Sequence, residues 1–280
     1  MLSPRRRFLA APFLLGPAGA KAATHFTTSD GVRLHLLTAG RGPLLVFVPG
    51  WTMPAWMFQP QLEAFAATHR VVAMDPRGQG NSDIPRSGYT AARRGPDIHE
   101  VLGHLGGGRA VVAGWSLGVL EALACLRAHG ESRLAGLVLL DNSIGLGPPP
   151  ARGNGNFLAA LRRARESTTR AFVARMFAEP PGEDYLARLT ADSLRTPTEA
   201  AVSLLSYNLP REAWRDAVLG TRLPTLYMVT PRLAGQAAEL RRQRSQAETV
   251  VMEGAGHALF VDQPEAFNAQ LADFLRRRVA

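Results

Sequence analysis

Short apolar runs recur along most of the chain, and stretches with helical spacing or turn residues separate them. Six runs have the length of a strand: residues 44–48, 71–74, 110–113, 137–140, 225–229 and 249–252. Because these runs are apolar rather than alternating, both faces of each strand should be buried, as in a parallel sheet covered by helices. Upstream, residues 24–28 and 32–38 predict a β-hairpin around a Ser-Asp-Gly turn. The pattern predicts an α/β fold with a mostly parallel, doubly wound sheet and helices on both faces.

One long segment, residues 144–221, carries no strand pattern. Its apolar residues recur at helical spacing, and prolines punctuate it. The helical stretches that we expect there are 156–176, 183–195 and 198–209. Because this segment interrupts the alternation of strands and helices, it predicts a helical cap inserted between two late strands. The core would then comprise residues 24–143 and 222–280.

The first 23 residues have the pattern of a cleavable export signal. Three arginines at positions 5–7 precede an apolar run that ends at Leu15, and small residues follow. Cleavage after Ala20, Ala22 or Ala23 would fit the pattern. The apolar run is shorter than the roughly 20 residues that span a bilayer. No cysteine lies nearby to carry a lipid, so we expect no stable membrane anchor.

The arginine pair in this segment indicates a route of export. Arg5 and Arg6, followed by Phe8 and Leu9, resemble a twin-arginine signal. The twin-arginine machinery is therefore the predicted export partner, and the mature protein is expected in the periplasm or outside the cell. An ordinary Sec signal is the alternative.

Charge and cysteine content narrow the classes of function. The formal net charge is +9, but the arginines are scattered along the chain, so we do not expect nucleic-acid binding. The one cysteine, Cys125, excludes an intramolecular disulfide and a thiolate metal cluster, and we expect it to be a buried structural thiol. No GxGxxG or GxxxxGKS motif is present. The sequence therefore predicts neither a cofactor nor a metal.

A glycine-rich turn supplies the first candidate for catalysis. Residues 114–118 read Gly-Trp-Ser-Leu-Gly, directly after the run 109–113 and directly before a helical stretch, 119–128. A nucleophile elbow requires this strand–turn–helix context. The tight turn would present the Ser116 hydroxyl at the sheet edge, near the positive end of a helix. Ser116 is the predicted nucleophile, and a glycine-rich turn without chemistry is the alternative.

The elbow is accompanied by three further segments that resemble the α/β-hydrolase family. Residues 47–52 (FVPGWT) resemble the loop that forms the oxyanion hole, and residues 75–82 (DPRGQGNS) resemble the D-x-R-G-x-G-x-S loop. Residues 253–258 (EGAGHA) resemble the loop of the catalytic histidine. Asp75 and Arg77 are expected to hold their own loop. The resemblance covers the chain after the signal segment, is weakest in the cap, and implies a cofactor-independent serine hydrolase.

The family's order of catalytic residues is serine, acid, histidine. Of the seven histidines, His129 and His257 follow Ser116. His129 ends the helix that Ser116 begins, and the rise of that helix places it about 20 Å away. His257 lies in a loop with Gly254 and Gly256, from which an imidazole can reach over the sheet edge. His257 is therefore the predicted general base.

The acid is less firmly defined by the sequence. The family most often carries it after the penultimate strand, but residues 229–234 (VTPRLA) contain no acid. Asp141 ends the run 137–140, and some α/β-hydrolases place the acid there. Asp141 is the predicted partner of the His257 Nδ1. Glu239, Glu253 and the complete lack of an acid remain alternatives.

The resemblance also implies an oxyanion hole and a pocket. The backbone N–H groups of Leu117 and Trp51 are the expected donors to a developing oxyanion. Trp51 and Trp115 flank the nucleophile and are predicted to shape an apolar pocket for the acyl group. Trp56 and Phe58, by contrast, are expected to pack in the core.

These residues predict an exported serine hydrolase that cleaves an ester, or a related small acyl substrate, through an acyl-Ser116 intermediate. An aminopeptidase or amidase, a carbon–carbon bond hydrolase and a perhydrolase would use the same residues. Epoxide hydrolases and haloalkane dehalogenases are disfavoured because those relatives carry an aspartate where Ser116 stands. A ligand-binding relative without activity is the alternative from another class.

Overall fold

The computed structural model describes residues 22–148, 155–206 and 209–279. The predicted export signal lies outside the described residues, except for Ala22 and Ala23, which begin the first strand. Within the described part of the chain, no helix is both long enough and apolar enough to cross a membrane.

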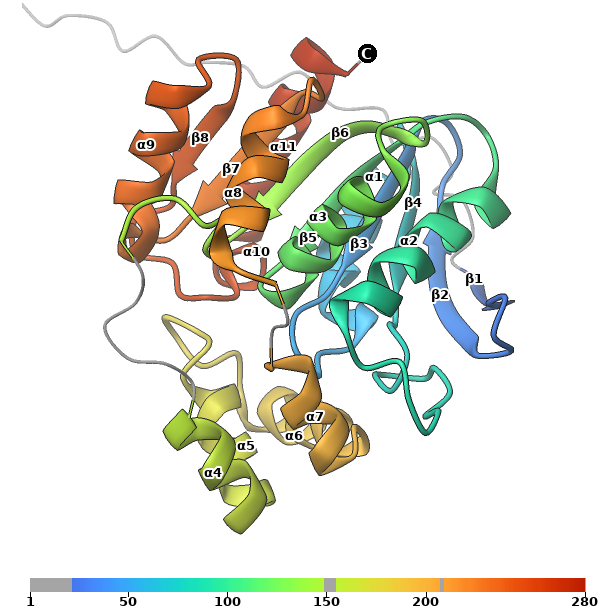
Figure 1. Cartoon of the computed structure of the whole chain (residues 1–280), viewed down its shortest axis with the longest axis vertical. Coiled ribbons are helices and arrows are strands. Elements are labelled where there is room, and N and C mark those ends of the chain that lie inside the picture. The colour runs from blue at the N-terminus through green and yellow to red at the C-terminus, as the bar shows by residue number, and fades with distance from the viewer. Residues whose placement is uncertain (1–21, 149–154, 207–208, 280) are drawn as a thin grey trace, which may run out of the picture.

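An eight-stranded sheet forms the centre of the molecule (Figure 1), with the strand order β1-β2-β4-β3-β5-β6-β7-β8. The strands are β1 (Ala22–Thr27), β2 (Arg33–Ala39), β3 (Leu44–Val48), β4 (Arg70–Met74), β5 (Ala110–Trp115), β6 (Leu134–Leu140), β7 (Thr225–Val229) and β8 (Glu248–Val251). β1 and β2 form the predicted hairpin, and β2 pairs antiparallel with β4. All other neighbours are parallel. The predicted fold class is confirmed.

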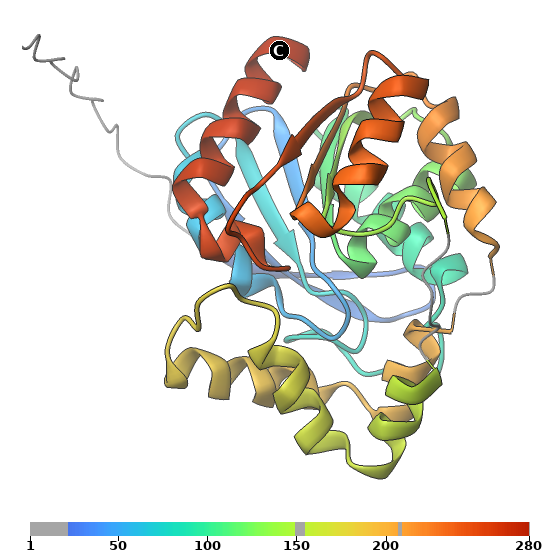
Figure 2. The ribbon, with the colours of Figure 1, turned by 90° about the vertical axis from the view of Figure 1, so that its left-hand side faces the viewer.

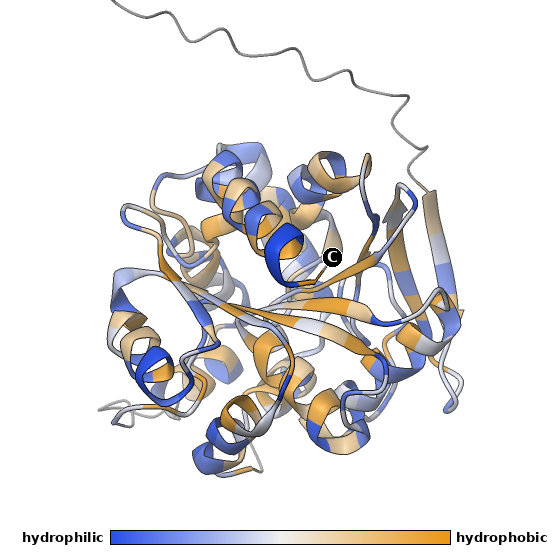
Figure 3. Ribbon diagram, turned by 90° about the horizontal axis from the view of Figure 1, so that it is seen from above, coloured by the Kyte–Doolittle hydropathy of each residue, from blue (hydrophilic) through white to orange (hydrophobic). Residues whose placement is uncertain are grey.

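Helices cover both faces of this sheet (Figure 2), so its apolar strands are shielded from water on both sides. The core helices are η1 (Ala55–Phe58), α1 (Gln59–Phe65), α2 (Ala91–Leu105), α3 (Leu117–His129), α8 (Arg211–Gly220), η2 (Pro231–Leu233), α9 (Ala234–Gln243), α10 (Leu259–Asp262) and α11 (Pro264–Arg278). Viewed from above, the apolar strands lie between helices that combine apolar and polar sides (Figure 3). β5 shows why two cores result: Ala110 and Val112 pack on one face, and Val111, Ala113 and Trp115 pack on the other.

The cap lies below one edge of the sheet (Figure 1) and comprises α4 (Gly155–Arg163), α5 (Arg165–Ala174), α6 (Glu183–Arg195) and α7 (Thr198–Leu204). It differs from the predicted segment in two respects. The helix expected over 156–176 is interrupted at Ala164, whose φ of −149° and ψ of 65° are not helical. α8, expected within the cap, packs against α3 and covers the sheet instead. The helices that cover the sheet edge are therefore α4 to α7, and they span fewer residues than the segment 144–221.

Candidate active site

Ser116 connects β5 to α3 with a strained backbone. Its φ is 53° and its ψ is −120°, a region that residues with a side chain rarely adopt. The two glycines of the motif explain how the turn is accommodated. A Cβ on Gly114 would lie 2.3 Å from the Gly118 oxygen, and a Cβ on Gly118 would lie 2.3 Å from the Val48 oxygen. No side chain fits at either position, so the strand and the helix can cross closely enough to expose Ser116.

His257 lies in the loop between β8 and α10 and joins Ser116 to Asp141. The imidazole Nε2 is 2.9 Å from the Ser116 Oγ, and the Nδ1 is 2.7 Å from the Asp141 Oδ2. The structure thus brings together the three side chains that the sequence singled out. Oγ, imidazole and carboxylate form one continuous line of hydrogen bonds, the arrangement by which a hydroxyl becomes a nucleophile.

Asp141 is buried at the end of β6, with 0% exposure and a φ of 41°. Its second oxygen, Oδ1, accepts hydrogen bonds from both the N–H and the hydroxyl of Thr230, each at 2.8 Å. Burial raises the pKa of the carboxyl, but the hydrogen bonds from His257 and Thr230 outweigh burial and hold the pKa below its usual value. Asp141 therefore stays ionised beside the imidazole.

At the end of β7, where the family most often has the catalytic acid, this chain has Thr230. Thr230 donates its N–H and its hydroxyl to the carboxylate of Asp141, the acid at the end of β6. The other candidates lie elsewhere. Glu239 is hydrogen-bonded to Arg242 on the surface of α9, and His129 stacks on His99, with ring centroids 4.0 Å apart.

The two expected oxyanion donors lie beside the nucleophile. A Cβ on Gly50 would lie 3.0 Å from the Ser116 Cβ, so the turn after β3 passes directly over the serine. Leu117 is the first residue of α3, where an N–H has no partner within the helix. Among the described residues, none accepts a hydrogen bond from the backbone N–H of Trp51. Both amides can therefore donate to an oxygen held in front of Ser116.

The loop after β4 contacts the turn that carries the Trp51 backbone N–H and helps to hold that turn in place. The Arg77 guanidinium is buried and donates to the carboxylates of Asp30 and Asp97. The Gln79 side chain donates to the Gly50 oxygen at 3.0 Å. Arg77 thus holds its own loop, as expected. The contact of Gln79 with the oxyanion turn was not foreseen from the sequence.

A cavity of about 270 Å³ opens over Ser116 and His257. Five of its nine lining residues are apolar, and four of the nine come from the cap. The lining residues that the sequence did not single out are Asn142, Phe157, Phe172, Arg175 and Leu205. Trp51 also lines the cavity, as predicted. Its indole donates to the Ala201 oxygen of α7 at 2.7 Å and packs edge-on against Phe172.

Trp115 does not line this cavity, and the expectation that it would is wrong. Its side chain has 0% exposure and lies on the opposite face of β5 from the residues that pack under α3. The indole donates to the His257 backbone oxygen at 2.8 Å and packs edge-on against Phe260. Trp115 therefore supports the histidine loop. The alternation along residues 110–115 carries this information, because successive side chains of a strand point to opposite faces.

The remaining candidates are structural. Phe58 stacks on Phe47 and Phe260, as expected for a core residue. Trp56 is partly buried and donates to Asp192 of the cap. Burial raises the pKa of the Cys125 thiol to about 12, so it carries almost no thiolate near neutral pH.

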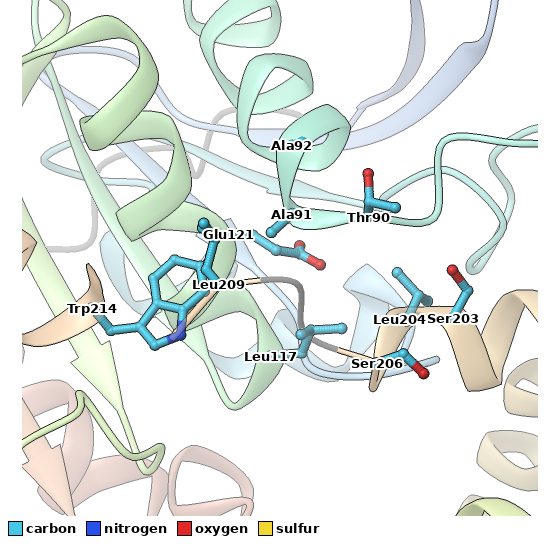
Figure 4. Close-up of a pocket in the computed structure, with 10 residues that line it drawn as sticks. All are labelled: Thr90, Ala91, Ala92, Leu117, Glu121, Ser203, Leu204, Ser206, Leu209 and Trp214. Carbon is cyan, nitrogen blue, oxygen red and sulfur yellow. The ribbon is translucent and has the colours of Figure 1, made fainter. Parts of the chain in front are cut away.

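A second, smaller cavity of about 120 Å³ lies on the far side of Leu117, between α2, α3, α7 and α8 (Figure 4). The Glu121 carboxylate points into it and pairs with Arg94 at 3.0 Å. Burial raises the pKa of Glu121 to about 7. Neither Ser116 nor His257 lines this space. The chemistry of the elbow therefore belongs to the larger cavity.

Residues 45–270 match the model of the alpha/beta hydrolase family. The chain belongs to this family. Over 96% of its length it is 29% identical to the polyketide synthase ThaQ of Burkholderia thailandensis, of which it spans only 13%. It is 24% identical to the AB hydrolase superfamily protein YisY of Bacillus subtilis, over 89% of this chain and 98% of that protein.

Solved structures of α/β-hydrolases superimpose well on this one. The esterase EaEST from Exiguobacterium antarcticum gives a TM-score of 0.79 at 23% identity, over 91% of this chain and 100% of that chain. The family assignment and the enzyme class expected from the sequence are thereby confirmed. Within the described ranges, no three His, Cys, Asp or Glu side chains are grouped as metal ligands.

Proposed function

We propose that this α/β-hydrolase is a serine hydrolase that cleaves an ester, or a related small acyl substrate, through an acyl-Ser116 intermediate. One observation carries the proposal: the Ser116 Oγ lies 2.9 Å from the His257 Nε2, while the Asp141 carboxylate lies 2.7 Å from the Nδ1 of the same ring. A ligand-binding relative without activity has no need of this complete line of hydrogen bonds. The proposal therefore favours an enzyme over a binding protein.

In the first half of the reaction, His257 accepts the Ser116 proton while Oγ attacks the substrate's carbonyl carbon. The N–H groups of Trp51 and Leu117 donate to the oxyanion, and the ionised Asp141 stabilises the imidazolium. His257 then gives the proton to the leaving alcohol as the acyl–oxygen bond breaks. In the second half, His257 deprotonates water, which attacks the acyl carbon and returns Ser116 with release of the acid.

The cavity supports a small, fairly apolar acyl group. Its volume of about 270 Å³ lies just below the roughly 300 to 1,000 Å³ of typical ligand pockets, and Phe157, Phe172 and Leu205 give it apolar walls. The similarity to the esterase from Exiguobacterium antarcticum favours an ester over the other acyl substrates. Aminopeptidase, amidase, carbon–carbon hydrolase and perhydrolase activities use the same residues and are alternative outcomes of the test.

The test compares purified protein on short- and long-chain aryl esters, a lactone, a peptide anilide and hydrogen peroxide with a carboxylic acid. We expect short-chain aryl esters to give the highest kcat/KM, because the cavity is small. Turnover of the peptide anilide alone would replace the esterase assignment by an aminopeptidase. No turnover of any substrate by folded protein would favour the ligand-binding alternative.

We also propose that the protein is exported by the twin-arginine machinery. The Arg5-Arg6 pair before an apolar run supports this, as does the single cysteine, because no disulfide has to form outside the cytoplasm. Changing Arg5 and Arg6 together to Lys should leave the full-length protein in the cytoplasm, measured by cell fractionation. Mature protein in the periplasm of cells that lack the twin-arginine machinery would instead identify a Sec signal.

A further inference from the structure

Among the described residues that line the catalytic cavity, one side chain, Arg175, is permanently charged. Arg175 follows the last residue of α5 and lines the same space as Ser116 and His257. The walls around it are largely apolar, with Phe157 and Phe172 on the cap side. Arg175 is exposed, so its guanidinium stays hydrated and charged beside this cavity. There it can attract an anionic group of a molecule that enters.

In the part of the chain that the structure describes, no acidic side chain pairs with Arg175. Two other arginines of the cap are paired with acids: Arg162 with Glu199, and Arg170 with Glu166, each at 2.9 Å. Within residues 22–148, 155–206 and 209–279, no carboxylate or other acceptor bonds to the Arg175 side chain. Its hydrogen-bond donors therefore remain free for a molecule that enters the cavity.

The backbone beside Arg175 is fixed to the catalytic histidine's loop. The Ala258 N–H donates to the Met176 oxygen at 2.9 Å. The Asp262 carboxylate accepts from the N–H groups of Ala178 and Gly256, at 3.0 and 2.7 Å. Because these bonds tie the residues after Arg175 to both sides of His257, the guanidinium is attached to a support that keeps its place relative to the reacting atoms.

We propose that Arg175 is a specificity-determining residue that binds a carboxylate of the substrate, so that the preferred substrates are half-esters of dicarboxylic acids. This inference rests on the proposed serine hydrolase function. The planar guanidinium matches a carboxylate with two parallel hydrogen bonds. A carboxylate carries one charge, which one arginine neutralises, whereas a phosphate monoester carries nearly two and would need a second cation that the cavity does not contain.

The Asn142 side chain can assist at the same place. It lines the cavity, and its amide carries two N–H donors for an acid group. The overall reaction then consumes a half-ester and one water and yields the alcohol and the dicarboxylic acid. The ester bond breaks at Ser116, while the distal carboxylate stays on Arg175 and undergoes no chemistry.

The test uses two aryl esters with the same leaving group and acyl chains of equal length, one ending in a carboxylate and the other in a methyl group. Arg175→Gln should lower kcat/KM for the carboxylate ester by roughly 5- to 10-fold, between the effect of an exposed ion pair and that of a charge-assisted hydrogen bond. The neutral ester should change by less than about twofold. The matched control is Arg170→Gln, which removes an exposed arginine of α5, the helix that Arg175 follows, outside the cavity.

Inhibition gives a second readout. A short dicarboxylate should competitively inhibit hydrolysis of the neutral ester by the wild-type protein, and much less so in Arg175→Gln. Equal effects of Arg175→Gln on both esters, or none on either, would overturn the inference while leaving the serine hydrolase proposal intact. Failure of the wild-type protein to hydrolyse either ester would overturn the proposed function, and this inference with it.

Discussion

Replacement of Ser116 by alanine is expected to lower kcat for ester hydrolysis by up to about 10⁶-fold, as for loss of the nucleophile in a well-studied serine protease. Without Oγ, His257 has no hydroxyl to deprotonate, and no acyl intermediate can form. The oxyanion donors remain, so a small residual rate above that of water is expected.

The fold should survive this change, because the Ser116 side chain contacts the histidine rather than a core residue. Thermal unfolding by circular dichroism should therefore give a Tm close to that of the wild type. Ser203→Ala is the matched control: it removes a cap hydroxyl that donates to the Tyr89 oxygen, away from the catalytic line. Ester turnover by Ser116→Ala at the rate of this control would end the serine hydrolase account.

Asp141→Asn is expected to lower kcat by about 10²- to 10⁴-fold with little change in KM. The amide would place N–H donors where Oδ2 now accepts from His257, and it would hold the imidazole in the tautomer that carries its proton on Nε2. That nitrogen then cannot take the Ser116 proton. The loss should appear in kcat measured at saturating ester.

Two comparisons make this prediction specific. Glu239→Gln changes the acid that was the next candidate, and it should leave kcat near that of the wild type because Glu239 pairs with Arg242 on the surface. Near-normal activity of Asp141→Asn together with a large loss in Glu239→Gln would reassign the acid. Since the pKa of Asp141 is lowered, its contribution to folding stability should persist above its unfolded pKa and disappear only as the pH falls through the folded value.

The features that could be predicted from the sequence are local. The strands and the elbow follow from a few adjacent residues, because an apolar run with flanking glycines has few other structures open to it. The position of Asp141 at the end of β6 was also visible from the run before it. The sequence favours Asp141 but leaves Glu239 open as an alternative. The contact that decides between them joins residues 116 positions apart, where the histidine loop meets the sheet.

The features that could not be predicted depend on long-range packing. Arg175 reaches the cavity only because the cap folds back over the sheet, and its own helix gives no sign of this. The packing of α8 is another such feature, because this helix is amphipathic like the cap helices, yet it contacts α3. Trp115 is adjacent to Ser116 in the sequence, and this suggests a place in the pocket. Its side chain instead packs in the core on one face of β5.

The most direct test of the central claim is to trap the covalent intermediate and find the residue that carries it. Protein treated with a fluorophosphonate, or quenched during turnover of a slowly deacylated ester, would be digested and its peptides analysed by mass spectrometry. We expect one adduct per chain, on Ser116. Ser116→Ala should abolish it, and Asp141→Asn should form it more slowly. An adduct on another residue, or ester turnover with no adduct on Ser116, would contradict the central claim.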